Sequence, residues 1–335
     1  MEETSRVPTE PIFRPMAQET DDISYFFFIW VIPVVVGIPG NALAIIVANR
    51  KHNRQLSPCV YMTAMGVADT VLLLERIMAI VLNKVLLAHG FVTEPLWWFR
   101  IQVYILYTSS ILSGLFLAGM SVDRLIAVRF PMDAQRLCTT SRARTTVVMM
   151  FLSIAVLNGH LFYVLQYFYD KQLGIYAILI LAPDPELEIL EGISTSFQLV
   201  VGTILPFFII FTCNILIIIT LKQASKARQR LETNQKNVEL KSQHLTRMLL
   251  FVSFAYVITT LPYRLYHLTM KIPVVANLYD LRVLYWRKQY VISVWSLIIV
   301  WMFNYSLNFY LYCIGGGRKY RDDAKLVLSR LFRLR

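Results

Sequence analysis

Seven separate apolar segments, each about long enough to cross a lipid bilayer, constrain this chain of 335 residues more than any other feature. A helix needs about 20 apolar residues to cross a hydrocarbon core about 30 Å thick. Since 56% of the residues are hydrophobic and only 16% are charged, a soluble domain of this size could not bury the apolar surface. The sequence therefore predicts an all-α membrane protein, a seven-transmembrane helix bundle. The predicted spans are Tyr25–Asn49, Pro58–Val85, Trp97–Val128, Thr145–Tyr169, Ile193–Leu221, Leu245–Met270 and Tyr290–Ile314, of which the fourth is interrupted by Asn158, Gly159 and His160.

The net charge of +12 could indicate a nucleic-acid partner, but the lysines and arginines lie between the apolar segments rather than in one domain. That distribution favours cytoplasmic loops beside anionic lipid, and no nucleic-acid partner is expected. The connections after the first, third and fifth spans and the C-terminal tail are rich in these residues. The bias predicts a multi-pass plasma-membrane protein whose N-terminus is extracellular and whose C-terminus is cytoplasmic.

Three regions follow from this pattern. Residues 1–24 are polar and acidic and are expected to form an extracellular disordered tail. Residues 25–314 form the seven-transmembrane domain. Residues 315–335 are expected to form a short amphipathic helix on the membrane surface and a cytoplasmic tail, because apolar side chains recur there at helical spacing among basic residues. The apolar residues of this stripe are Tyr320, Ala324, Val327, Leu328 and Leu331.

A few polar side chains fall in the middle of apolar spans, where an ionisable group costs several kcal/mol unless it is paired or faces water. Asp69 lies in the second span, and Asn304 and Asn308 share one face of the seventh. A single buried asparagine most often holds two helices together. A carboxylate with amides and a hydroxyl at similar depth, here Asn41 and Ser113 as well, also has the oxygen ligands that suit a hard monovalent cation. The sequence leaves both interpretations open.

Motifs in chain order resemble those of the rhodopsin-like (class A) G-protein-coupled receptors over nearly the whole chain. The matching residues are Gly40-Asn41, Met65-Gly66-Val67-Ala68-Asp69, Asp123-Arg124, Pro206, Leu261-Pro262-Tyr263 and Asn308-Phe309-Tyr310-Leu311-Tyr312. Within the family, Arg129-Phe130-Pro131 and Leu261-Pro262-Tyr263-Arg264 are similar to neuropeptide receptors. The resemblance implies an extracellular ligand, a heterotrimeric G protein as partner, and outward movement of the sixth helix on activation.

The resemblance also assigns roles to residues. It implies a sodium pocket, with Na⁺ as an allosteric ion and no other cofactor, formed by Asp69, Ser113, Asn304 and Asn308. It implies a role in G-protein coupling and activation for Asp123, Arg124, Pro206, Tyr256, Pro262, Asn308 and Tyr312.

Several family positions are altered. Phe99 stands where the family has the cysteine that ties the third span to the second outer loop, and the loop from Asp170 to Gly192 has no cysteine. Altered positions that the family uses for activation carry Gly114, Asn214, Ser242, Tyr256, Thr260 and Phe309. Because Ser242 replaces the acid that often holds the arginine, we expect a local Asp123–Arg124 pair to hold the resting state.

The outer half of the bundle should contain the ligand site. Leu106 replaces the aspartate of amine receptors and Met302 the lysine of retinal proteins, so neither ligand is expected. The ligand-binding candidates are Glu75, Gln102, Leu106, Tyr107, Tyr263, Arg264, His267 and Trp295. Arg264 is expected either to pair with Glu75 or to receive a carbonyl or carboxylate of the ligand.

The mixed charge of the outer loops favours a peptide ligand over a lipid. Nothing completes a catalytic site, so no enzyme is expected, and no repeat of the transporter type is present. The function predicted from sequence is therefore a G-protein-coupled receptor for a peptide. The alternatives are a non-signalling seven-helix ligand-binding protein and a receptor for a non-peptide small molecule or lipid.

Overall fold

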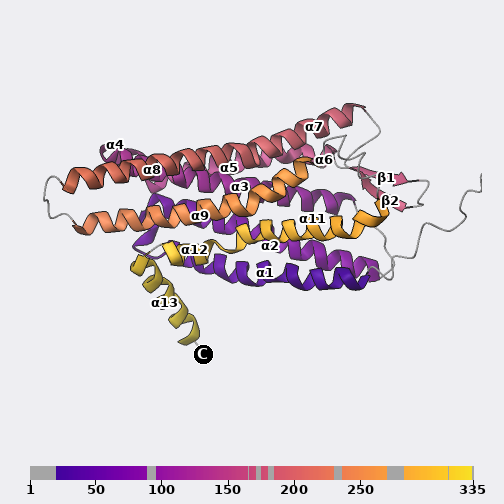
Figure 1. Ribbon diagram of the computed structural model, residues 1–335, viewed down its shortest axis with the longest axis horizontal. Helices are drawn as coiled ribbons and strands as arrows, with labels where there is room; N and C mark the ends of the chain where they lie inside the picture. The colour runs from indigo at the N-terminus through magenta and orange to yellow at the C-terminus, as the bar shows by residue number, and fades with distance from the viewer. Residues whose placement is uncertain are drawn as a thin grey trace, which may run out of the picture.

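A computed structural model describes residues 20–88, 96–164, 166–170, 175–179, 185–229, 236–269, 283–315 and 317–333. Long helices run side by side as one bundle (Figure 1), and each of the seven predicted spans contains a helix. They are α1 (Thr20–Ala48), α2 (Ser57–Ala88), α3 (Leu96–Arg129), α5 (Thr140–Leu157) with α6 (Leu161–Val164), α7 (Pro185–Leu199) with α8 (Leu205–Gln229), α9 (Lys236–Thr269), and α11 (Val283–Ser306) with α12 (Asn308–Gly315). The predicted bundle is confirmed, and the chain is a multi-pass membrane protein.

Length and composition support this assignment directly. Among the described residues, four helices are long and apolar enough to cross a membrane, and the bent pair in the last span raises the number to five. The four are Val31–Ala48, Trp97–Arg129, Thr140–Val164 and Gly192–Ala224. The bent pair, Ser296–Ser306 and Asn308–Gly315, turns through 55° although Phe309 stands where the family has proline. At the bend, Ser306 Oγ donates to Met302 O, 3.0 Å away.

Two predicted boundaries were wrong. α1 begins at Thr20, so residues 20–24 are helical and do not belong to a disordered tail; residues 1–19 lie outside the described part. The fourth span ends at Val164 rather than Tyr169. At its predicted interruption, Asn158–His160 forms a 3-10 turn between α5 and α6.

A β-hairpin follows the fourth span. Strand β1 (Gln166–Asp170) pairs antiparallel with β2 (Ile175–Leu179), in a register that places Phe168 opposite Ala177. All four cysteines of the chain are free. The paired strands are an element that the helical pattern did not predict.

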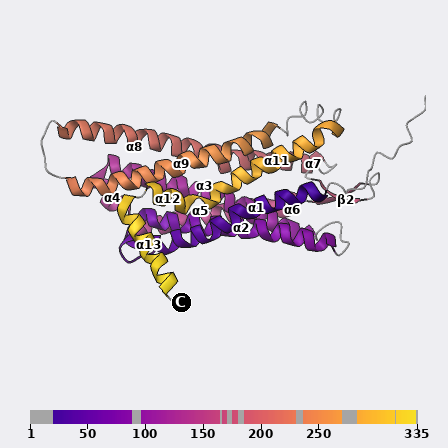
Figure 2. The same ribbon diagram turned by 60° about the horizontal axis from the view of Figure 1, so that its bottom comes forward.

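Helix α13 (Gly317–Arg333) leaves the bundle at the end opposite the hairpin (Figures 1 and 2). Asp323 anchors it: the carboxylate accepts from Arg50 Nη1 at 2.6 Å and from Asn53 Nδ2 at 3.0 Å, both in the connection between α1 and α2. Ala324 and Val327 are buried against the bundle, whereas Arg321 and Lys325 are exposed. Part of the predicted apolar stripe therefore packs on protein, and its position at a lipid surface stays a prediction.

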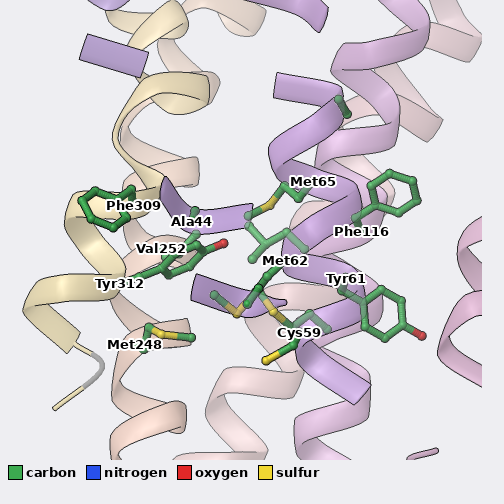
Figure 3. Packing of buried hydrophobic residues seen from close by; sticks show 14 of the residues in the cluster. Ala44, Cys59, Tyr61, Met62, Met65, Phe116, Met248, Val252, Phe309 and Tyr312 are labelled. Carbon is green, nitrogen blue, oxygen red and sulfur yellow. The ribbon is translucent and has the colours of Figure 1, made fainter. Parts of the chain in front are cut away.

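Two apolar clusters form the core, and a polar layer separates them. The larger cluster lies toward α13 and includes Met62, Met65 and Tyr312, as Figure 3 shows. The second lies toward the hairpin and includes Leu72 and Trp301. Since Ala68 belongs to the first cluster and Leu72 to the second, Asp69 lies at the boundary between them.

Asn158 joins three helices by two buried hydrogen bonds. Its Nδ2 donates to Thr108 Oγ1 on α3 at 2.9 Å, and its Oδ1 accepts from Gln198 Nε2 on α7 at 3.1 Å. Asn158 is fully buried. We expect Asn158→Leu to lower the free energy of unfolding by about 1 kcal/mol or more, because the partners lose their bonds in an apolar interior. Thermal unfolding of the purified protein measures this, with Gln135→Leu on an exposed position as control; equal stability of the two variants would contradict it.

Candidate functional site

Asp69 is the centre of the polar layer. It is fully buried, and each carboxylate oxygen accepts one hydrogen bond. Ser113 Oγ on α3 donates to Oδ1 at 2.6 Å, and Asn308 Nδ2 on α12 donates to Oδ2 at 2.7 Å. Three of the four residues predicted for the sodium pocket thus meet. Asn304 is buried on the same span, and no hydrogen bond from it to Asp69 is recorded in the described part of the chain.

The layer has oxygen atoms to offer a hard cation. Besides the carboxylate and the Ser113 hydroxyl, Asn41 contributes an amide whose Nδ2 donates to Tyr305 O at 2.9 Å. Its Oδ1 is buried and has no hydrogen-bond partner. A buried carbonyl-type oxygen without a donor is chemically suited to Na⁺, although hydroxyl and amide donors already bind both oxygens of Asp69.

A second polar group lies toward the hairpin, one turn above Ser113 on α3. Ser110 Oγ is 2.8 Å from Tyr305 Oη and accepts from Arg264 Nη2 at 3.2 Å. The Arg264 guanidinium lies 5.8 Å from the centre of the Trp301 ring. Trp301 in turn stacks on Tyr263 and meets Tyr305 edge-on. The result is one buried cation surrounded by hydroxyl groups and aromatic rings.

The predicted pairing of Arg264 with Glu75 is wrong. Glu75 is buried and forms an ion pair with its neighbour Arg76, whose Nη2 donates to Glu75 Oε1 at 2.6 Å. The competing interaction is local, because adjacent side chains in the same helix reach each other without any change in helix packing. Arg76 therefore neutralises the charge of Glu75, and Arg264 donates to Ser110 instead.

The other predicted ligand-binding residues are placed in part. Gln102 is buried on α3, Leu106 packs against the cluster that contains Trp301, and Tyr107 is half-buried. The side chains of His267 and Trp295 lie outside the described part, although both residues lie within helices α9 and α11. Sequence reasoning missed Ser110, Trp301 and Tyr305. Ser110 precedes Ser113 by three residues, so helical spacing could have placed both on one face of α3.

The middle of the bundle has an unusual contact at Gly114. A five-residue π-helix, η4 (Val200–Ile204), precedes Pro206 and joins α7 to α8. Tyr256 Oη on α9 donates to Gly202 O in this π-helix at 3.4 Å. A Cβ at Gly114 would lie 3.0 Å from that hydroxyl and 3.6 Å from Pro206 Cγ. The tyrosine hydroxyl therefore uses the space that a side chain at Gly114 would occupy.

At the α13 end, Asp123 and Arg124 interact electrostatically but do not form the expected ion pair within 4 Å. Asp123 Oδ2 instead accepts from Ser57 Oγ on α2 at 2.9 Å, and Cys138 Sγ donates to Asp123 O at 3.4 Å. Burial and the nearby charge of Asp123 raise the pKa of the Cys138 thiol to about 11, so the thiol stays protonated as this bond requires. Arg124 is buried, and its Nε has no hydrogen-bond partner.

Arg124 therefore belongs to a group of buried polar residues at the α13 end, here called the inner group, whose side chains have atoms without a hydrogen-bond partner. Tyr312 Oη on α12 is also buried and unpartnered. Pro262 lies inside α9 with its ring exposed, so the helix carries a break in its hydrogen bonding above these residues. Unsatisfied groups at one end of a bundle can form bonds only if a partner arrives or the helices move.

Helix α12 approaches α9 closely at Gly315. A Cβ there would lie 2.4 Å from Met248 Cα and 2.9 Å from Met248 N. Figure 3 shows Met248 and Val252 beside Tyr312. Only glycine allows this approach, because the opposing atoms are backbone and cannot rotate away.

A model of the 7 transmembrane receptor (rhodopsin family) matches residues 40–311 of the chain. Cysteinyl leukotriene receptor 1 from Homo sapiens is 26% identical over 238 residues, which make up 69% of this chain and 64% of that protein. The receptor of the same name from Sus scrofa is 25% identical over 247 residues, with the same coverage. The chain thus matches less than two thirds of the length of these relatives. The predicted likeness to neuropeptide receptors finds no support among them.

Proposed function

Since the chain belongs to the rhodopsin family of seven-transmembrane receptors, the class A G-protein-coupled receptors, we propose that it binds an extracellular ligand and activates a heterotrimeric G protein. The observation that supports the proposal is the series of buried polar groups that follow one another along the length of the bundle. Arg264, Ser110 and Tyr305 lie above Asp69, and the inner group of Arg124 and Tyr312 lies at the α13 end. The proposed activity is signalling by a receptor rather than catalysis.

The proposed mechanism is a population shift between two helix packings. A ligand near Arg264 favours the active packing only if it binds that packing better. α9 can hinge at Pro262, and its inner end then moves away from Gly315 of α12. The movement would give a G-protein segment access to Arg124, whose unpartnered Nε supplies a donor for it.

The relatives' name favours a lipid over the peptide that the sequence predicted. Both are called cysteinyl leukotriene receptor 1, at 26% and 25% identity. The surroundings of Arg264, with Tyr263 and Trp301 stacked beside it, suit an amphiphile that has an apolar body. We infer a small lipid-like ligand. The mixed charge of the outer loops remains the argument for a peptide.

We also propose that the chain lies in the plasma membrane with its N-terminus outside. The start of α1 and the helix α13 lie at opposite ends of the bundle (Figures 1 and 2). The basic residues gather in the α13 tail and in the connections at the same end, and such residues are retained on the cytoplasmic side.

Nucleotide exchange tests the function. The purified protein is reconstituted in nanodiscs with one G protein of each major class, and exchange is measured with panels of lipid mediators and peptides. A receptor accelerates exchange on at least one G protein in response to at least one compound. If ligands bind but exchange never changes, the alternative of a non-signalling binding protein is correct.

Sodium should stabilise the protein through Asp69. At a tenfold excess over its dissociation constant a bound ion adds about 1.4 kcal/mol, or roughly 3 °C in melting temperature for a domain of this size. We expect Asp69→Asn to abolish the difference between sodium and potassium, because the amide carries no charge. Asp322→Asn on α13 is the matched control, since that carboxylate is exposed. Identical sodium titrations of wild type and Asp69→Asn would remove the ion from the mechanism.

A further inference from the structure

Arg264 is a buried cation whose hydrogen-bonding capacity is only partly used. The residue is 8% exposed, and its Nη2 donates to a neutral hydroxyl, Ser110 Oγ. A guanidinium has five N–H donors in a fixed plane, and the Nε–H of this one is buried and has no hydrogen-bond partner.

No carboxylate in the described part of the chain forms an ion pair with Arg264. Glu75 is held by Arg76, and both oxygens of Asp69 are held by Ser113 and Asn308. An unpaired charge inside a membrane-spanning bundle costs several kcal/mol. An anion bound next to Arg264 would offset this cost, and neither Glu75 nor Asp69 is paired with Arg264.

The neighbours of Arg264 define what kind of anion fits. Ser110 and Tyr305 add hydroxyl groups, and Trp301 presents a ring to the guanidinium. One uncompensated positive charge balances a carboxylate better than a doubly charged phosphate. A carboxylate also matches the planar fork of arginine and accepts two parallel hydrogen bonds from it. The rings of Tyr263 and Trp301 offer an apolar face to the rest of the molecule.

We propose that Arg264 is a carboxylate-binding subsite, and that the receptor's ligand is an amphiphilic acid whose carboxylate accepts a hydrogen bond from Arg264 Nε beside Ser110 and Tyr305. The inference rests on the proposed function in one respect, the position of the ligand site. It needs no signalling, so binding of an acid can be measured without a G protein.

The test compares matched acids and neutral compounds by thermal unfolding of the full chain in phosphatidylcholine nanodiscs. The lipid pair is decanoate and methyl decanoate; the peptide pair is an N-acetylated apolar tripeptide as free acid and as amide. At a tenfold excess over the dissociation constant, the bound acid raises the melting temperature by about 3 °C more than its neutral partner. Arg264→Gln loses this difference, and Arg321→Gln, which removes an exposed arginine from α13, retains it.

The outcomes distinguish a lipid acid from a peptide carboxylate. They also distinguish a failure of the subsite proposal from a failure of the proposed signalling function. Protection by decanoate alone identifies a lipid acid, and protection by the free-acid tripeptide alone identifies a peptide carboxylate; both support the subsite. The inference is overturned if neither acid protects wild type more than its neutral partner, a comparison that needs no variant to fold. It is also overturned if Arg264→Gln is protected as much as wild type. An acid that binds in this way but never changes nucleotide exchange would refute the signalling function and leave the subsite intact.

Discussion

Replacing Gly315 by alanine raises nucleotide exchange in the absence of ligand by about fivefold or more, because overpacking by one methyl group costs about 1–3 kcal/mol and the active packing avoids that cost. The new Cβ would lie 2.4 Å from Met248 Cα, and no rotamer change relieves a contact with backbone. Separation of α9 from α12 removes it, and the proposed activation requires the same separation. Basal exchange on a reconstituted G protein measures the effect.

Gly192→Ala is the matched control for this substitution. Gly192 lies in helix α7, and a Cβ there meets nothing within 4 Å. The control should leave both exchange and melting temperature close to wild type. A Gly315→Ala protein that is folded, binds the same ligands and has wild-type basal exchange would show that this contact does not hold the resting state.

Replacing Arg124 by alanine should reduce ligand-stimulated exchange about tenfold or more, since a hydrogen bond to a charged group contributes about 1.5–3 kcal/mol. Arg124 is buried, and its Nε is free to donate to an arriving G-protein segment. Ligand affinity in the absence of G protein should not change, because Arg124 lies at the opposite end of the bundle from Arg264. Exchange assays and ligand-binding isotherms on the same preparation measure both quantities.

Arg129→Ala supplies the comparison, because Arg129 is exposed at the end of the same helix and its guanidinium lies over Phe130. This variant loses the same charge without touching the buried group. If Arg124→Ala and Arg129→Ala reduce exchange equally, the effect comes from the surface charge of the inner face, and Arg124 has no particular role.

The helix bundle could be predicted from sequence because lipid leaves the backbone few alternatives. In a hydrocarbon environment each span must satisfy its own hydrogen bonds, so apolar length alone predicts a helix. The same argument placed Asp69, Ser113 and Asn308 together, since each is a polar residue at similar depth, and the structure joins them by two short hydrogen bonds.

Side-chain pairing could not be predicted in the same way. Glu75 bonds to Arg76 and Asp123 to Ser57, whereas sequence reasoning expected Arg264 and Arg124. The charge and the depth of a side chain narrow its possible partners, but which partner it binds depends on side-chain rotamers and on small rotations of the helices. The resemblance to the family suggested Arg124 as the partner of Asp123, whereas the structure pairs Asp123 with Ser57.

The bend in the last span and the β-hairpin were missed for a different reason. The sequence lacks the proline that would have indicated a bend, and a serine at position 306 does not distinguish this place from the other helices, where serine and threonine make the same bond to the preceding turn. The strands β1 and β2 lie where apolar residues were assigned to the end of a span or to a loop. Short apolar runs of this kind do not distinguish a strand from a helix by periodicity.

The four free thiols have a practical consequence for work on this molecule. Cys59, Cys138 and Cys313 lie toward the α13 end and Cys213 is buried within α8, so no native cysteine lies on the hairpin strands. A thiol-reactive label added to the native protein would therefore not react on the strands β1 and β2.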